Sequence, residues 1–252
     1  MELRSFTKIL CGLLLGAGLS LLLTGCAKDA KEPPRGESIA LTGDRPAVPV
    51  PEPATAQPAA AARSFEILAR ASEIRILVYR EGRLAALGHN HVISTQEVRG
   101  RLVLTPGIRA STLELEIPVT SLVVDDPVLR EKSGEAFDTE PSPEDIAGTR
   151  RNMLGERVLD AANHPTIALS ARAVSASLPE LELEVELRVR SATLRFRTEA
   201  RVETRENRLI ARGQFTLSHS QLGLEPFSVL GGALSVSNEM TIHYRLVAEA
   251  EQ

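Results

Sequence analysis

Strict alternation of apolar and polar residues is the feature that most restricts how this chain can fold. Apolar residues hold every second position from Leu181 to Val189, and the positions between them are all Glu or Arg. The same period of two covers residues 194–202 and most of residues 234–246. A period of two with one polar face indicates antiparallel strands in a sheet that has one face in water. The pattern therefore predicts an all-β domain.

Further alternating runs raise the number of expected strands to eight or nine; they lie at about 65–70, 73–80, 97–104, 113–117, 166–175 and 207–217. Several runs exceed nine residues. That length is more typical of a barrel or an extended sandwich than of a short-stranded immunoglobulin domain. Strands that each carry one apolar face must close on themselves or pack as two sheets.

One helix is expected, at about 143–154, in the longest interruption of the alternating pattern. The sequence Ser142-Pro143-Glu144-Asp145 supplies an N-cap residue, a proline at the first helical position and early acidic side chains. Apolar positions such as Ile146 and Met153 follow at helical spacing.

Residues 1–25 are expected to be a lipoprotein signal peptide. After Arg4 and Lys8 comes an apolar run of 15 residues, shorter than the about 20 that a membrane-spanning helix needs. The run ends in Leu23-Thr24-Gly25-Cys26, which looks like a bacterial lipobox, so Cys26 is the expected site of lipidation, with palmitate among the acyl chains. The alternative is a plain secretory signal with an incidental cysteine. No cysteine follows Cys26.

Residues 26–63 are expected to be the lipidated cysteine and a disordered Pro/Ala-rich tether. Residues 27–63 hold seven of the 15 prolines, and their five basic and five acidic residues cancel. Such a segment favours an extended polyproline conformation over a packed core. A folded domain then occupies residues 64–252. Because Ala27 and Lys28, and no Asp, directly follow Cys26, we expect a periplasm-facing membrane lipoprotein, in the outer rather than the inner membrane.

Composition argues against several function classes. The net charge of −4 offers no cationic surface for phosphates, so nucleic-acid binding is not expected. Aromatic residues make up only 3% of the chain, which disfavours stacking platforms. Ser218-His219 lacks a Ser-His-Asp context, and Gly231-Gly232 lacks the Lys-Ser/Thr of a phosphate loop. No constellation in the sequence supports an enzyme, so none is expected.

Several expected inward positions carry small residues: Gly100, Ala171, Ala173, Ala200, Ala211, Gly213 and Ala248. The interior of an eight-stranded barrel is just wide enough to be filled by side chains or to hold one small ligand. Small inward side chains favour a cavity, whereas interleaved Leu side chains would fill the same space. Composition alone leaves both readings open.

His89 and His91 stand two residues apart, so on an extended segment they face the same way. That spacing permits metal ligation, but a zinc site needs three or four donors. Asp125, His219 or His243 would complete such a site only if the fold brought them close. The imidazoles can equally hydrogen-bond to the backbone, or contact a ligand head group, at the mouth of a barrel.

Asp125-Asp126-Pro127 is expected to close a strand, because proline ends ladder pairing. The Asp side chains can cap the turn and pair with Arg130. Adjacent residues on a strand point to opposite faces, which disfavours joint acid–base catalysis by the two carboxylates.

Several short motifs follow one another in a definite order: Gly88-His89-Asn90-His91, Ser121-Leu122-Val123-Val124-Asp125-Asp126-Pro127, Val158-Leu159-Asp160-Ala161, His164-Pro165-Thr166-Ile167, Ser218-His219-Ser220-Gln221-Leu222-Gly223-Leu224-Glu225-Pro226 and Leu230-Gly231-Gly232-Ala233-Leu234. From about Phe65 to Leu246, their order and spacing resemble the YceI-like family. The family pattern usually has Gly-His-Asp-His where this chain has Asn90. It often has aromatics near Pro165 and before Gly223, where this chain has His164 and Leu222.

The resemblance implies an exported protein with an extended, lipocalin-like antiparallel barrel. It also implies that the barrel holds a long isoprenoid chain, such as a polyprenyl or quinone tail, with no covalent cofactor. The candidate ligand-binding residues, in the cavity or at its mouth, are His89, Asn90, His91, Phe196, Ala200, Ala211, Phe215, Met240 and Tyr244.

An alternative function is a metal- or haem-associated redox accessory protein that uses His89 and His91, since some family members are linked to cytochrome-type partners. The expected partners are the membrane, through the lipid anchor, and the hydrophobic ligand. The sequence is also compatible with a homodimer.

Overall fold

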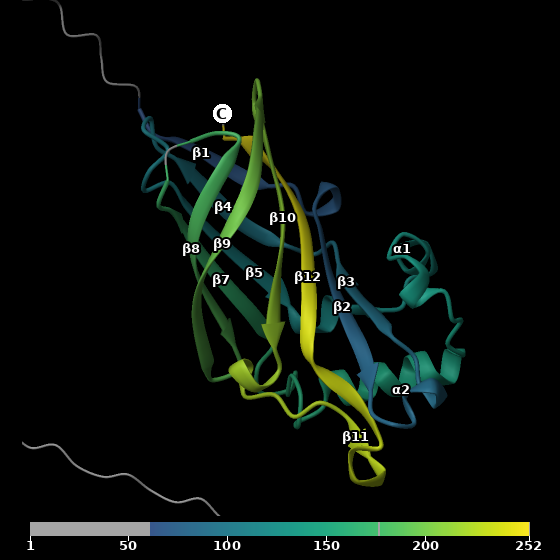
Figure 1. The fold of residues 1–252 in the computed structure, drawn as a ribbon. Helices are drawn as coiled ribbons and strands as arrows, with labels where there is room; N and C mark the ends of the chain where they lie inside the picture. The colour runs from purple at the N-terminus through teal and green to yellow at the C-terminus, as the bar shows by residue number, and fades with distance from the viewer. Residues whose placement is uncertain (1–60, 176, 252) are drawn as a thin grey trace, which may run out of the picture. The chain divides into compact units, whose positions relative to one another are not determined.

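The computed structural model describes residues 61–175 and 177–251. The expected signal peptide, Cys26 and residues 26–60 of the expected tether lie outside this part of the chain. Regular structure begins at Arg63, one residue before the expected start of the domain. As the alternation predicts, the fold is dominated by antiparallel strands, which Figure 1 shows wrapped around a common interior.

The strands are β1 (Arg63–Ile67), β2 (Glu73–Glu81), β3 (His91–Thr95), β4 (Arg99–Leu104), β5 (Thr112–Pro118), β6 (Val123–Val124), β7 (Thr166–Ala173), β8 (Glu180–Val189), β9 (Ala192–Arg205), β10 (Arg208–Ser218), β11 (Ser228–Val229) and β12 (Leu234–Ala250). The helices are α1 (Pro127–Glu131) and α2 (Pro143–Leu154). Short 3-10 helices lie in the connections: η1 (Ala69–Ala71), η2 (Ala85–Leu87), η3 (Val119–Ser121), η4 (Glu135–Phe137), η5 (Ser220–Leu222) and η6 (Leu230–Gly232).

Eight of the strands form a closed ring in the order β1-β4-β5-β7-β8-β9-β10-β12. The ring closes where β12 pairs with β1, through Phe65↔Ala250, Glu66↔Glu249 and Ile67↔Ala248. All of these pairings are antiparallel. The predicted antiparallel barrel of eight or so strands is therefore confirmed.

Of the four other strands, β11 pairs with β12, and β2, β3 and β6 continue three of the ring strands beyond the barrel. β1 and β2 are joined by η1, β3 and β4 by a bend at residues 96–98, and β5 and β6 by η3. The first member of the outer set, β2, pairs with β12, and β3 and β6 follow in turn. Three long bent segments thus each contribute one half to the ring and one half to a side sheet.

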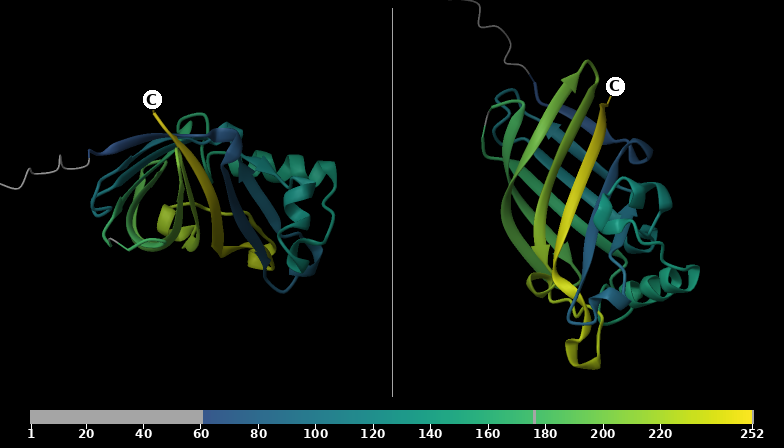
Figure 2. Two further views of the ribbon diagram at one scale, coloured as in Figure 1. Left: turned by 90° about the horizontal axis from the view of Figure 1, so that it is seen from above. Right: turned by 45° about the vertical axis from the view of Figure 1, so that its right-hand side comes forward.

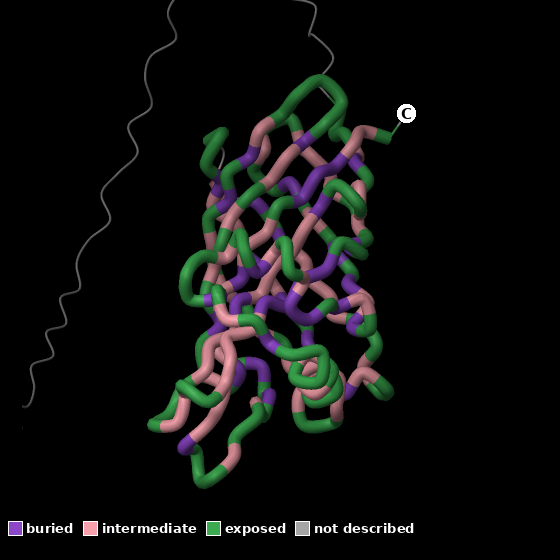
Figure 3. Tube along the Cα trace, turned by 90° about the vertical axis from the view of Figure 1, so that its right-hand side faces the viewer, coloured by how far each residue is buried: buried purple, intermediate pink, exposed green. Residues whose placement is uncertain are grey.

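The burial pattern follows the alternation that the sequence shows. Figure 3 shows buried and exposed positions taking turns along many of the strands. On β8, for example, Leu181, Val185 and Leu187 are buried, and the residues between them reach solvent. The inward residues of the ring form one continuous aliphatic core.

Strand β3 was not predicted, because it has no solvent-exposed face along which polar residues would alternate with apolar ones. Its last four residues are all buried. Ile93 belongs to the core inside the barrel, whereas Val92 packs on the opposite face with Leu77 and Phe137. A strand covered on both faces loses the period of two that marks a half-exposed strand.

The predicted helix is present as α2, with the expected ends. Ser142 is its N-cap, and the Ser142 hydroxyl and the Asp145 carboxylate form a reciprocal capping box. A second helix, α1, was not predicted, because five residues are too few for a periodic signal. It begins where the Asp126 carboxylate accepts hydrogen bonds from the N–H groups of Val128 and Leu129.

Both helices lie on the same side of the barrel, beside the side sheet (Figure 2). Within residues 61–175 and 177–251, no helix has the length and the apolar character needed to cross a bilayer.

Candidate functional site

A cavity of about 230 Å³ lies inside the barrel. Every ring strand except β1 contributes to its lining, together with β2, β3 and a residue of α2. The volume exceeds the roughly 150 Å³ of an apolar cavity that stays dry and binds benzene, and it is slightly below the about 300–1,000 Å³ of typical ligand pockets. The interior of this barrel is therefore hollow, and it suits one slender ligand.

The lining of the cavity is almost entirely aliphatic. Among the described residues that line it there is no Asp, Glu, Lys or Arg, and the ionisable ones are His219 and Tyr244. An ion has no counter-charge in such a space, so its desolvation would go uncompensated. An uncharged hydrocarbon chain, by contrast, gains about 25 cal/mol for each Å² of apolar surface removed from water.

Five of the residues singled out from the sequence lie in this lining: Ala200, Ala211, Phe215, Met240 and Tyr244. Phe196 has the same inward parity but is not in the lining. Its ring packs against that of Phe215, with 5.0 Å between the centroids.

Among the small inward residues, Ala171 and Ala173 also line the cavity, whereas Gly100, Gly213 and Ala248 do not. Sequence reasoning missed most of the aliphatic lining residues as candidates. Their inward parity was the signal that could have identified them.

The end of the cavity near η5 is covered by side chains from several connections. Leu222 and Leu224, in and after η5, are buried and line the cavity. Met153 of α2 and Leu159, from the connection that follows it, lie in the same lining. Leu178, in the loop between β7 and β8, lines the opposite end of the cavity, where the neighbouring Pro179 carbonyl accepts a hydrogen bond from the Val202 N–H beside the β9–β10 hairpin, and it is 41% exposed.

The two ionisable lining residues both stay uncharged near neutral pH. Burial lowers the pKa of His219, although its ring Nδ1 lies 3.1 Å from the carbonyl oxygen of Asn238. Burial raises the pKa of Tyr244 to about 12. Its hydroxyl donates a hydrogen bond, 3.4 Å long, to the backbone carbonyl of Glu199.

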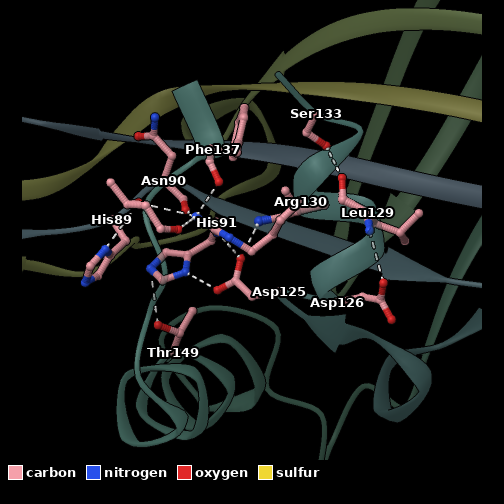
Figure 4. Close-up of polar contacts among 12 residues, drawn as sticks. His89, Asn90, His91, Asp125, Asp126, Leu129, Arg130, Ser133, Phe137 and Thr149 are labelled. Carbon is pink, nitrogen blue, oxygen red and sulfur yellow. Dashed lines mark hydrogen bonds and ion pairs between the residues drawn. The ribbon is translucent and has the colours of Figure 1, made fainter. Parts of the chain in front are cut away.

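The histidine pair lies outside the cavity lining, in a separate polar cluster around a buried carboxylate (Figure 4). His91 Nδ1 lies 2.6 Å from Asp125 Oδ2, and Arg130 Nη1 lies 2.5 Å from Asp125 Oδ1. The backbone N–H of Val92 also donates to Asp125 Oδ1, at 2.9 Å. We call His91, Asp125 and Arg130 the His–Asp–Arg cluster.

Hydrogen bonds hold the Asp125 carboxylate in its ionised form. Its side chain is completely buried, and burial alone raises the pKa of a carboxyl group. The hydrogen bonds from His91, the Val92 N–H and Arg130 outweigh this effect and lower the pKa of Asp125 below its usual value. The pairing of Asp125 with Arg130 is as the sequence predicts.

Arg130 uses its remaining donors to hold the loop between α1 and α2. Its guanidinium donates to the backbone carbonyls of Asn90, Phe137 and Thr139, at 2.8, 2.9 and 2.6 Å. Asn90 ties the same loop to β2, because its Oδ1 accepts from the Arg80 N–H and its Nδ2 donates to the Ala136 carbonyl. Asn90 therefore makes structural contacts with the backbone.

His89 and His91 make different contacts. His91 shares its parity on β3 with the cavity residues Ile93 and Thr95, but its Nε2 lies 3.4 Å from the Thr149 hydroxyl of α2. The His89 ring points away from Asp125 in Figure 4, and its Nε2 lies 3.9 Å from an Asp145 carboxylate oxygen. The two ring centroids are 6.4 Å apart.

One hydroxyl and one possible metal-binding arrangement in this region can be compared with known sites. Thr149, His91 and Asp125 place a hydroxyl, an imidazole and a carboxylate in a row, with 3.4 Å between the Thr149 hydroxyl and His91 Nε2 and 2.6 Å between His91 Nδ1 and Asp125 Oδ2. Across residues 61–175 and 177–251, no group of three or more His, Cys, Asp or Glu side chains is placed to hold a metal ion.

Comparison with known proteins agrees with this architecture. The model of the YceI-like domain matches residues 65–248. The chain belongs to the YceI-like family. The match spans the barrel and its side sheet, and so confirms the resemblance seen in the motifs.

Two solved structures are similar to this chain at low sequence identity, and the first of them shares its fold. BcnA of Burkholderia cenocepacia superposes with a TM-score of 0.54 at 11% identity, over 72% of this chain and 98% of that one. A YceI protein of Campylobacter jejuni gives a TM-score of 0.44 at 8% identity, over 62% of this chain and 82% of that one. No curated protein matches the sequence significantly.

Proposed function

We propose that this YceI-like protein is an exported, membrane-anchored binding protein that holds one isoprenoid-type chain inside its barrel. The observation that carries the proposal is the hollow aliphatic interior, without a charged lining side chain among the described residues. A hydrocarbon chain is the ligand class for which such a lining provides affinity without an uncompensated charge.

Branched, unsaturated prenyl units suit a lining built largely from Leu, Ile and Val. A chain in the cavity would contact mostly aliphatic groups, with Phe215 and Tyr244 as the Phe and Tyr residues of the lining. The cavity volume of about 230 Å³ favours a single slender chain over a fused ring system. Because the polar cluster around Asp125 lies outside the lining, we assign it to the scaffold and assign the ligand to the barrel interior.

The anchor in this proposal is an acylated Cys26, joined to the barrel by residues 27–63. Support comes from the lipobox-like sequence at residues 23–26 and the proline-rich composition that follows it. Two or more acyl chains suffice for stable membrane attachment. The proposed place of the protein is the periplasmic side of the outer membrane.

The test is to extract the purified protein with organic solvent, identify the lipid by mass spectrometry and then fill the cavity. Ala200 is buried and lines the cavity, so Ala200→Phe places a phenyl ring in the space assigned to the ligand. We expect the wild type to yield a prenyl lipid. The variant should lose most of it while unfolding within about 3 °C of the wild type, less than about 1–2 kcal/mol for a domain of this size.

Arg201→Phe is the matched control, because the adjacent residue is exposed on the outside of the same strand. It loses a surface ion pair with Glu180, an interaction that contributes little to stability. The control should keep its lipid. If the wild type yields no lipid and Ala200→Phe is destabilised by about 1–3 kcal/mol through overpacking, the interior is a filled core and the proposed function is wrong.

A further inference from the structure

The barrel wall is incomplete between β9 and β10. These strands form ladder pairs only from Arg208↔Arg205 to Arg212↔Arg201. Beyond that point, residues 192–200 of β9 pair with β8 alone, and residues 213–218 of β10 pair with β12 alone. Figure 1 shows the two strands leaving their shared hairpin together and then diverging. We call the unpaired stretch between residues 192–200 and 213–218 the slot.

On β9, the inward residues are less buried along the slot than beside the paired stretch. On β9, Ala200 and Val202 are buried beside the paired stretch, whereas Leu194, Phe196 and Thr198 are only half-buried along the slot. These three residues have the same inward parity as Ala200. These inward side chains of β9 reach solvent because no neighbouring strand covers them on the β10 side, where Phe215 is half-buried as well and Leu217 is buried.

The slot opens onto the cavity. Thr198 and Ala200 on its β9 side and Phe215 and Leu217 on its β10 side all line the cavity. The same residues that border the missing pairing therefore belong to the proposed ligand site.

Three aromatic side chains cover the slot. Phe196 and Phe215 reach towards each other from β9 and β10, and the Phe215 ring lies 6.2 Å from that of Tyr244 on β12. Tyr244 passes over Gly213 and bonds the Glu199 carbonyl on the far side. A side chain at residue 213 would collide with the Tyr244 hydroxyl, so this bridge requires glycine. The chain has only six Phe and two Tyr, and three of these eight aromatics lie here.

We propose that the ligand chain enters and leaves the cavity sideways through the slot, and that Phe196, Phe215 and Tyr244 form its movable cover. The inference rests on the proposed function, and it narrows the ligand class to single-chain amphiphiles. The uncharged lining would oppose the passage of a polar end group through the barrel. Through a side opening, the hydrocarbon chain can slide in while its polar end stays in water.

The test is to bridge the slot with a covalent cross-link and measure ligand exchange. Continuing the register of Arg201↔Arg212 by four residues on each strand sets Arg197 opposite Thr216, and both residues are exposed. The pair Arg197→Cys and Thr216→Cys is introduced into the full chain with Cys11→Ser and Cys26→Ser, and is bridged with a bis-maleimide. The matched control bridges Arg201→Cys and Arg212→Cys, which lie in the paired stretch of the same two strands.

The probe is cis-parinaric acid, a polyene fatty acid that fluoresces in apolar surroundings, followed by stopped flow. Bridging the slot should slow uptake and release by about tenfold or more, while the control bridge should change either rate by less than about twofold. Probe loaded before the slot is bridged should stay trapped when lipid vesicles are added. Folding and probe binding of each double-cysteine protein are measured before and after cross-linking, and the two results are compared.

Equal exchange rates with and without the slot bridge would overturn the side entrance and leave the binding function intact. Failure of the wild-type barrel to take up the probe would overturn the binding function and the entrance together. The two failures are therefore distinguishable in one series of measurements.

Discussion

His219 is the histidine in the otherwise mostly apolar lining of the cavity. Its imidazole is buried at the end of β10, and its Nδ1 lies near the Asn238 carbonyl oxygen. Burial favours the neutral ring and lowers the pKa of His219 below 6.5 in the folded protein. A lowered pKa means that the unfolded chain binds this proton more readily than the folded barrel does.

Acid should therefore weaken the barrel through His219. The stability contributed by the neutral ring is fully present above the unfolded pKa of 6.5, and it is lost as the pH falls through the lower folded pKa. We expect His219→Gln, which does not titrate, to lose less stability than the wild type between about pH 7.5 and 5. Urea unfolding at each pH measures the difference. Parallel pH profiles for the two proteins would contradict this assignment.

At the scale of elements, a single buried carboxylate attaches the segment from α1 to α2 to the side sheet. Asp125 follows β6, and its two oxygens bond side chains from β3 and α1 together with the β3 backbone. Arg130 then carries the contact onward to the carbonyls of Phe137 and Thr139. The loop between α1 and α2 is thus held by the hydrogen bonds around the Asp125–Arg130 ion pair and by the small core around Val92 and Phe137.

Asp125→Asn should detach this segment and destabilise the domain. Removing the charge leaves the Arg130 guanidinium, which is 8% exposed, without its counter-ion. Breaking a buried ion pair in this way costs about 3–5 kcal/mol, and at about 2–4 °C per kcal/mol the melting temperature should fall by roughly 6 °C or more.

Asp126→Asn is the control for Asp125→Asn, because it changes the next residue in the same manner. Asp126 caps α1, and Asn is as good an N-cap as Asp. Its melting temperature should therefore stay close to that of the wild type. The dependence of stability on acidic pH offers a second measurement. The stability that ionised Asp125 contributes is present above pH 3.8 and is lost as the pH falls through the lower pKa of Asp125 in the folded protein. Equal melting temperatures for both variants would refute the anchoring role.

The outer face of β8 and β9 shows how charge patterning sets strand register. Arg195 pairs with Glu186, Arg197 with Glu184 and Arg201 with Glu180, at 2.7, 2.7 and 2.6 Å. Each of these pairs joins residues directly opposite in the ladder. Exposed ion pairs add little stability. A shift of the ladder by one residue would instead turn the apolar side chains outwards, so burial and charge specify the same register.

At the scale of the whole molecule, the seam that closes the barrel is formed by described residues from Arg63 onward. β1 begins at Arg63 and pairs on one side with β4 and on the other with β12. Phe65 is 2% exposed and Ala248 is 1% exposed, so the closing seam lies in the core. The anchor and the binding domain are therefore expected to be separable.

Deleting residues 30–60 should leave the thermal stability of the barrel almost unchanged, because the seam begins at Arg63. Calorimetry of the deletion variant checks this. A fall in melting temperature of more than about 5 °C, beyond about 1 kcal/mol, would show that the segment packs on the barrel. The same deletion should keep the protein in the membrane fraction, whereas Cys26→Ser should release it. A Cys26→Ser protein that still sediments with membranes after a high-salt wash would refute the anchor.

Much of the fold was predictable because local sequence records which face of an element is buried. Alternation at residues 181–189 and 194–202 marked strands that have one face in water, and the capping residues before Ile146 marked the start of α2. Inward parity also singled out Ala200, Ala211 and Tyr244, which line the cavity. These signals lie within a few residues of each other along the chain.

Other features depended on contacts between distant segments. β3 was missed because α1 and η4 cover the face that would otherwise alternate, and no pattern within five residues reveals a distant cover. His91 has the parity of a cavity residue, yet its ring contacts Thr149 of α2, which lies 58 residues later in the chain.

The sequence by itself determined the class of the fold, its inward faces and its apolar interior, because hydrophobic periodicity is a property of each strand alone. Only the tertiary structure decided that the ring closes between Phe65 and Ala250, and that β9 and β10 part after Arg201 and Arg212. Each strand could pair with any of several other strands that have a similar alternating pattern. The packing of the whole domain selects among them, as where Tyr244 crosses Gly213 to reach the Glu199 carbonyl.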